Sequence, residues 1–91
     1  MFTKIGPNEV TNDQGFKIKI GRGFLTYFER NKSIGLNAEY GQGPDLIIQT
    51  SSIRKWHPPF DNEPVSSNKK AEIIARIEEA LSFLQVKYRL I

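Results

Sequence analysis

Cysteine is absent from this 91-residue chain, and histidine and tryptophan each occur only once. Without cysteine the chain can form neither a disulfide nor a thiolate metal site, and a single imidazole is too few ligands for a zinc centre. No apolar run approaches the roughly 20 residues that a membrane helix needs. We therefore expect a cytoplasmic protein that holds no metal or other cofactor and does not span a membrane.

The chain otherwise has the composition of a folded domain, with 38% hydrophobic and 25% charged residues. A chain of this length can bury one modest core, so we interpret residues 1–91 as a single domain. The net charge is +3. The basic residues are spread along the sequence rather than gathered in one tract, which gives only weak support to a nucleic-acid partner.

Short segments with alternating apolar and polar residues occupy most of the first fifty positions. Phe16, Ile18 and Ile20 would share one side of such a strand. Lys17 and Lys19 would share the other side, which is the pattern of a half-buried strand. The first candidate strand is weak because a Gly-Pro pair interrupts it. The expected strands are residues 2–10, 16–20, 25–30, 34–40, 46–50 and 86–90.

A helical pattern follows over residues 67–84, where apolar residues recur three and four positions apart. Ser66 or Ser67 is placed to cap its N-terminus. Glu72 and Arg76 are spaced for an ion pair on its surface. Its expected core face comprises Ala71, Ile74, Ile77, Ala80, Leu81 and Leu84, with Ile73 widening the stripe.

Strands followed by a helix indicate the α+β class. We expect an antiparallel sheet of about five to six strands, with one long C-terminal helix packed on one face and a terminal strand.

Residues that could perform chemistry are present only in incomplete sets. Ser51, Ser52, His57 and Asp61 lie near one another in the sequence. No nucleophile-elbow motif accompanies them, and these residue types occur together in most domains. A metal site built from His57, Asp61 and Glu63 would lack a fourth ligand and a fixed scaffold. The glycine-rich turns lack the further residues of a phosphate loop. We therefore expect no enzymatic activity.

The most distinctive stretch is residues 54–64, which holds the only tryptophan, the only histidine and three of the five prolines. Proline restricts its own backbone and that of the preceding residue, so this stretch is predicted to be a stiff, extended connection. Trp56 can pack inward against the helix or anchor an interface, and the first interpretation is favoured. Asp61 and Glu63 have no base after them until Lys69, so the second half of the stretch is locally acidic.

The same stretch carries a family resemblance. Its Ser-Ile-Arg-x-Trp-x-Pro-Pro motif, within residues 51–66, is followed by Ile-Ile at 73–74 and Ala-Leu-Ser-Phe at 80–83. Together with the Tyr-x-Glu … Glu-Tyr pattern of residues 27–40, these segments resemble a family of bacterial immunity proteins. That family accompanies polymorphic toxins, including those of contact-dependent growth inhibition systems.

The resemblance implies a protein that binds a cognate toxin domain and blocks its active site or the access to it. Such a protein needs no catalytic residue, and we expect it to be a monomer or a weak homodimer. Inhibitors of basic nucleases are often acidic, because complementary charge favours association. The net charge of +3 therefore indicates a different kind of toxin or a locally acidic contact. The contact residues that we expect are Tyr40, Asp45, Trp56, Asp61 and Glu63.

Two other function classes are compatible with the sequence. A small nucleic-acid-binding domain could use a basic strand face, with either Tyr27 or Phe28 as an exposed aromatic. The bases available to it are Lys17, Lys19, Arg22 and Lys32. A structural or assembly subunit would instead associate with copies of itself at ordinary concentrations.

Overall fold

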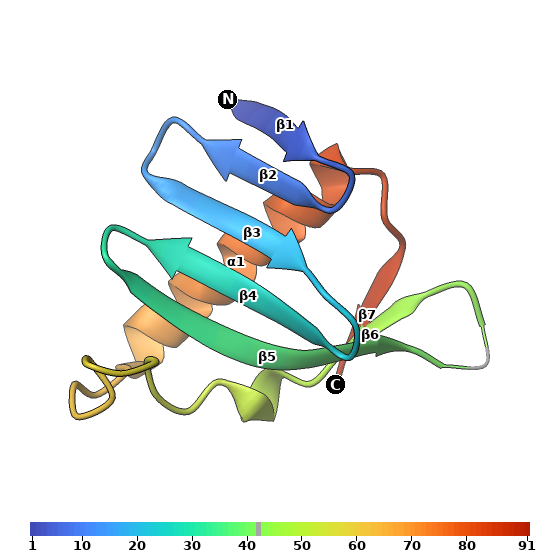
Figure 1. Ribbon diagram of the computed structural model, residues 1–91. Helices are drawn as coiled ribbons and strands as arrows, with labels where there is room; N and C mark the ends of the chain where they lie inside the picture. Colours follow the sequence, from blue (N-terminus) through green and yellow to red (C-terminus); the bar gives the residue numbers. More distant parts are fainter. Residues whose placement is uncertain (42) are drawn as a thin grey trace.

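A computed structural model of the protein describes residues 1–41 and 43–91. Within these residues lie seven strands, one long helix and a short 3-10 turn, η1 (Figure 1). In chain order the elements are β1 (Phe2–Gly6), β2 (Glu9–Asn12), β3 (Phe16–Ile20), β4 (Phe24–Glu29), β5 (Lys32–Tyr40), β6 (Leu46–Ile48), η1 (Thr50–Ser52), α1 (Ser67–Phe83) and β7 (Tyr88–Leu90).

Each strand lies beside its neighbour in the sequence, in the order β1 to β7. The pairs are antiparallel from β1 to β6, whereas β7 runs parallel to β6. The parallel pair arises because α1 lies between these two strands and carries the chain back along the sheet, as parallel connections require. The α+β class is confirmed. The expectation of five to six antiparallel strands is corrected, because the described residues form a mixed sheet of seven.

The additional strand comes from residues 2–10, for which the sequence predicts a single strand. β1 ends at Gly6 and β2 begins at Glu9, and the two form an antiparallel hairpin. Pro7 lies in the turn between them, where its fixed φ and missing N–H suit a turn better than a continuous ladder. The terminal strand is shorter than predicted, since β7 pairs with β6 only through residues 88–90.

Helix α1 begins directly after its N-cap residue. The Ser66 hydroxyl accepts a hydrogen bond from the Lys69 backbone N–H at 3.1 Å, so Ser66 rather than Ser67 is the N-cap. Ala71 is exposed, contrary to the predicted core stripe, because it lies about 120° around the helix axis from Ile77 at roughly 100° per residue. The buried residues are Ile73, Ile77, Ala80 and Leu81.

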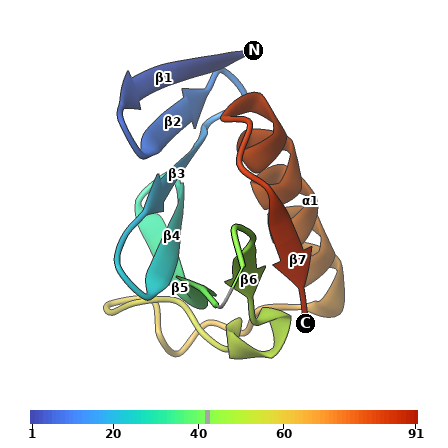
Figure 2. The same cartoon turned by 90° about the vertical axis from the view of Figure 1, so that its right-hand side faces the viewer.

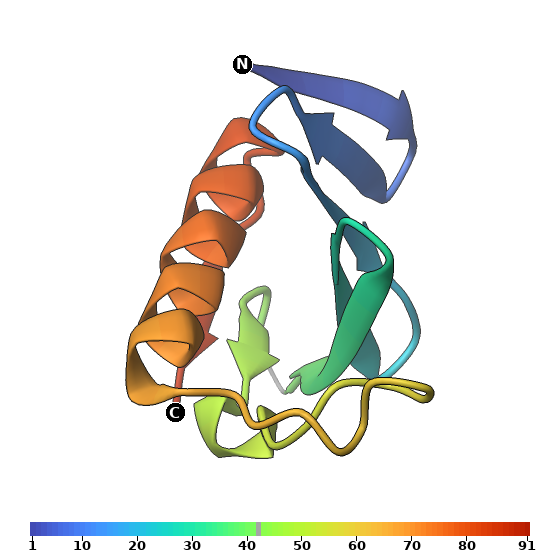
Figure 3. The same cartoon turned by 90° about the vertical axis from the view of Figure 1, so that its left-hand side faces the viewer.

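The helix packs against one face of the curled sheet, and within the described residues neither helix nor strand covers the opposite face of β2–β5 (Figures 2 and 3). Alternate residues of these strands point into the space between the two layers. Ile18, Leu25, Tyr27 and Leu36 are examples, and all are buried. The residues between them therefore lie on the uncovered face. No helix in the described part of the chain combines the length and apolar character that crossing a membrane requires.

Candidate binding surfaces

Residues 52–64, which we name the edge-capping segment, run along the edge of β5. β6 pairs with β5 only through residues 38–40, so the earlier part of this edge has no strand beside it. There the His57 N–H donates to the Ser33 carbonyl at 2.8 Å, and the Ser52 hydroxyl accepts from the Asn37 N–H at 2.9 Å. A bare strand edge is a template for pairing with another chain. The segment therefore protects β5.

Trp56 fastens the edge-capping segment to the core. Its side chain is 3% exposed and belongs to the same buried cluster as Ile77 and Leu81. The core interpretation of this residue is therefore confirmed. The ring offers almost no surface to a partner, and we correct the expected contact set by removing Trp56 from it.

The two acidic residues of the edge-capping segment have different surroundings. Glu63 accepts a hydrogen bond from the Lys32 ammonium at 2.7 Å, and the same ammonium lies 5.5 Å from the ring centres of Trp56 and Phe60. The expectation that Glu63 has no neighbouring base is therefore wrong, because its partner lies 31 residues away in the sequence. Asp61 is exposed, and the described residues provide it with no ion pair.

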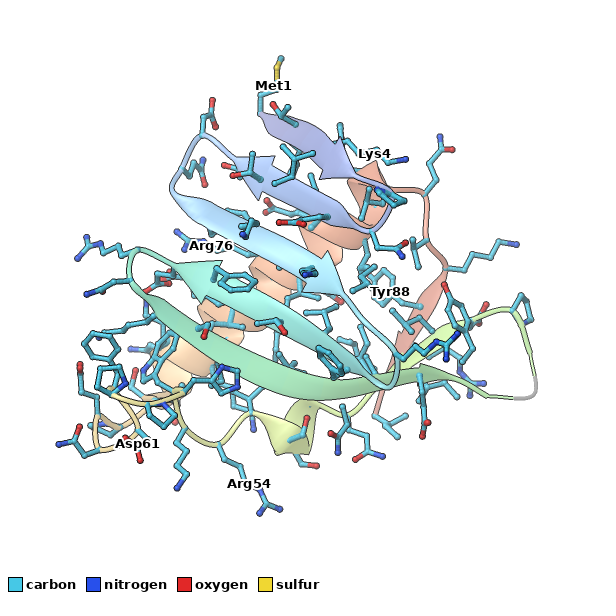
Figure 4. The ribbon with its side chains drawn as sticks, in the orientation of Figure 1. Met1, Lys4, Arg54, Asp61, Arg76 and Tyr88 are labelled. Carbon is cyan, nitrogen blue, oxygen red and sulfur yellow. The ribbon has the colours of Figure 1, made fainter. Side chains whose placement is uncertain are left out.

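The remaining two expected contact residues lie at the other end of the molecule. Tyr40 ends β5 and is 58% exposed, and the half-buried Asp45 precedes β6. The end of β5 and the start of β6 lie on the right of Figure 1, whereas Asp61 is labelled at the lower left of Figure 4. The structure therefore brings Asp61 and Glu63 together at one end, and Tyr40 and Asp45 together at the other.

A groove of about 500 Å³ lies beside Tyr40. Arg22 and Glu39 are among its polar lining residues. Its apolar lining residues are Ile20, Ala38, Leu46 and Val86. An exposed aromatic side chain next to a partly apolar groove is a common arrangement at protein interfaces.

A third surface is the uncovered side of the sheet, which we name the open face. The Lys17 ammonium lies 4.4 Å from the ring centre of Phe28 and 3.1 Å from a carboxylate oxygen of Glu9. Tyr27 is buried, so Phe28 is the aromatic of that pair on the open face, where Phe24 accompanies it. The side chains of the open face belong to Glu9, Thr11, Lys17, Lys19, Phe24, Thr26, Phe28, Ser33, Asn37 and Glu39.

Sequence reasoning missed Phe24, and a signal for it exists. Phe24, Thr26 and Phe28 alternate with the buried Leu25 and Tyr27, so extending the predicted strand by one residue places two phenylalanines on one side.

A partly buried polar network joins the sheet to the helix on the inner side. The Tyr27 hydroxyl donates to Glu29 Oε1 at 2.7 Å and accepts from Arg76 Nη1 at 2.8 Å. Lys69 Nζ lies 3.1 Å from Glu29, and the predicted pair of Glu72 and Arg76 is confirmed at 3.1 Å.

Two pKa values in this network are displaced. Burial alone would raise the pKa of Glu29, but hydrogen bonds from Tyr27 and Lys69 and the nearby positive charges outweigh it, so this pKa lies below its ordinary value. Burial, and then the hydrogen bond to Glu29, raise the pKa of Tyr27, so its hydroxyl remains a donor. These groups stabilise the contact between the two layers.

Among the described residues, His57 makes no hydrogen bond to Ser51 or Ser52. Its Nδ1 lies 2.9 Å from the hydroxyl of Ser33, while the hydroxyl of Ser52 is bonded to backbone groups of Asn37 and Gln49. Among residues 1–41 and 43–91, no three histidine, aspartate or glutamate side chains gather in a way that could hold a metal ion.

The fold therefore presents three exposed candidate surfaces around a small core. Comparison with protein-family models matches residues 17–90 to the family described as Immunity protein 74. The protein belongs to this immunity protein family, since the match runs from β3 to β7 and includes the whole edge-capping segment. Comparisons with curated proteins and with solved structures gave no match.

Proposed function

We propose that this protein binds a cognate bacterial toxin and neutralises it by covering the toxin's active site or the access to it. The observation that carries this proposal is the family match over residues 17–90. Neutralisation by binding requires a complementary surface and no catalytic residue. We further propose that the toxin belongs to a polymorphic toxin system, such as contact-dependent growth inhibition. The complex would form in the cytoplasm, without a cofactor and with a monomer or weak homodimer of this protein.

The proposed contact residues are Tyr40, Asp45, Asp61 and Glu63. Their surroundings indicate which of them should contribute most to binding. Tyr40 is a large, exposed aromatic beside a groove, and such side chains often contribute most to binding. Asp61 is exposed and free to pair with a base of the toxin. Glu63 is held by Lys32, and a new partner would have to compete with that pair.

The direct test is binding of the purified full chain to the toxin domain encoded by the adjacent gene. Calorimetry measures the dissociation constant, and co-expression measures protection from the toxin. We expect Tyr40→Ala and Asp61→Lys each to weaken binding by about tenfold or more. Glu79→Lys is the matched control for Asp61→Lys, because Glu79 lies on the exposed side of α1 and undergoes the same change of charge.

The possible outcomes test the proposed function and the proposed contact residues separately. A wild-type chain that neither binds the toxin nor protects against it would refute the proposed function. A wild-type chain that binds tightly, while both variants behave like the Glu79→Lys control, would refute only the proposed contact residues.

The nucleic-acid alternative is less favoured by the surroundings of its bases. Lys17 is paired with Glu9, and Lys32 with Glu63, so two of the four expected bases are already compensated. Counterion release from phosphates requires bases that are free to contact them. Titration with DNA and RNA oligonucleotides at two salt concentrations tests this alternative, which predicts binding that weakens steeply with salt. Light scattering tests the self-association alternative.

A further inference from the structure

We propose that an acidic patch of the cognate toxin docks on the open face, centred on Phe24, Phe28, Lys17 and Lys19. This inference rests on the proposed function and identifies the part of the molecule that carries it. It also identifies the chemistry of the partner's surface.

The apolar centre of the open face is exposed and preorganised. Phe24 is 49% exposed, and its ring lies so close to Gly21 that a Cβ built there would come within 2.7 Å of it. The ring therefore rests on bare backbone, which restricts its movement. An aromatic already held in place loses little entropy on binding, and exposed apolar patches mark interaction sites more often than scattered residues do.

The charges around Phe28 are mainly positive. The strand register places Lys17 opposite Phe28 and Lys19 opposite Thr26. Two acids lie on this face among the described residues: Glu9, whose carboxylate pairs with Lys17, and Glu39 near the end of β5. Lys19 is exposed and has no ion pair among those residues. A complementary partner is therefore acidic, and such a charge arrangement increases the association rate.

A base-lined hollow extends the positive region toward the β4–β5 turn. It has a volume of about 370 Å³, and its lining includes Lys17, Phe28 and Arg30. Arg30 adds a guanidinium, which can bind a carboxylate through two parallel hydrogen bonds. Acidic side chains of a toxin would meet fixed donors here.

The same observations favour an acidic protein over a nucleic acid. Sequence-tolerant nucleic-acid binding needs aromatic faces on which bases can stack. The Lys17 ammonium lies 4.4 Å from the centre of the Phe28 ring and occupies one of its faces. A carboxylate partner can exploit the exposed Lys19 and the edge of Phe24 without displacing these contacts.

The dimensions allow one partner to use the open face and the proposed contact residues together. A standard interface covers roughly 800 Å² per partner, a disc about 32 Å across. The longest dimension of the molecule is 36 Å. A toxin centred on Phe24 and Phe28 would therefore reach toward Tyr40 at one end and Asp61 at the other.

A pair of charge reversals tests the docking surface. Lys19→Glu places an acid on the open face. Lys87→Glu makes the same change of net charge at an exposed position of the segment between α1 and β7. That segment lies on the helix side of the molecule (Figure 2). Affinity and association rate for the purified toxin domain are measured by surface plasmon resonance at low and physiological salt. Circular dichroism and thermal unfolding establish that each full-length variant is folded.

We expect Lys19→Glu to raise the dissociation constant about tenfold or more, mainly through slower association, and Lys87→Glu to change it less than about twofold. Phe24→Ser should also weaken binding by about tenfold. Its effect should appear mainly as faster dissociation of the complex. The charge effect should diminish at the higher salt concentration.

The possible failures are distinct. If the wild-type chain does not bind the toxin, the proposed function fails and this inference fails with it. If the wild-type chain binds but Lys19→Glu and Phe24→Ser match Lys87→Glu, only the docking surface is wrong. If a single-stranded RNA binds with the Lys19 dependence expected here while toxin binding is unaffected, the acidic-protein partner is wrong.

Discussion

Replacing Trp56 distinguishes a core residue from an interface anchor. Truncating a buried tryptophan to alanine costs about 3–5 kcal/mol. The 3% exposure of Trp56 places it in this class. The Lys32 ammonium 5.5 Å from the ring adds about 0.5–1 kcal/mol that the variant also loses. A domain of 91 residues is stable by about 5–14 kcal/mol, so Trp56→Ala removes a large part of the total.

Trp56→Phe is the milder variant that keeps the experiment interpretable. It removes three heavy atoms net and should cost about 2 kcal/mol, at roughly 0.8 kcal/mol for each buried methylene equivalent. This loss lowers the melting temperature by about 8–16 °C in a domain of this size. Urea unfolding followed by circular dichroism measures the loss. In the wild-type chain, the fluorescence of the single tryptophan should shift to longer wavelength in the same transition.

Toxin affinity completes the test, measured well below the melting temperature of each variant. Because the ring is buried, folded Trp56→Phe should bind the toxin as the wild-type chain does. Two results would contradict this reasoning: an unfolding midpoint of Trp56→Ala equal to that of the wild-type chain, or a tenfold loss of affinity in a fully folded Trp56→Phe.

Three further changes probe how the fold is held. Ser66→Ala should cost about 1 kcal/mol through loss of the helix cap, and Ser67→Ala close to nothing, measured by thermal unfolding. Gly21→Ala should lower stability or displace the Phe24 ring, which two-dimensional NMR detects. The pKa of Glu29 is lower when folded, so its stabilising contribution exists above its unfolded pKa and is lost as pH falls through the folded pKa. Glu29→Gln should flatten that acidic limb of the stability profile.

Local patterns were sufficient to predict the elements in the middle of the chain. The alternation of Phe16 to Ile20 marks β3, which the structure contains with those limits, and the three-and-four spacing marks α1 to within one residue. Both signals arise from neighbours in the sequence, so a single chain is sufficient to recognise them. Within residues 2–10, the local pattern did not distinguish between one interrupted strand and a hairpin of two strands.

Features that depend on distant partners could not be predicted in this way. The pairing of Glu63 with Lys32, and the parallel alignment of β7 with β6, join residues that no local pattern connects. The path of the edge-capping segment depends on how far β6 extends along β5, because a shorter β6 leaves the edge that this segment occupies. The spacing of residues in the sequence does not show how many residues of β6 pair with β5.

The order of the elements has a consequence for how the protein is made. Strands β1 to β5 leave the ribosome first, and each can pair with the strand just synthesised. Their inner faces carry buried residues from Val10 to Ala38, and the helix that covers them begins only at Ser67. During synthesis this apolar face has no partner until the last part of the chain emerges. A chain that stops before the helix leaves this apolar face exposed, and an exposed apolar face favours aggregation.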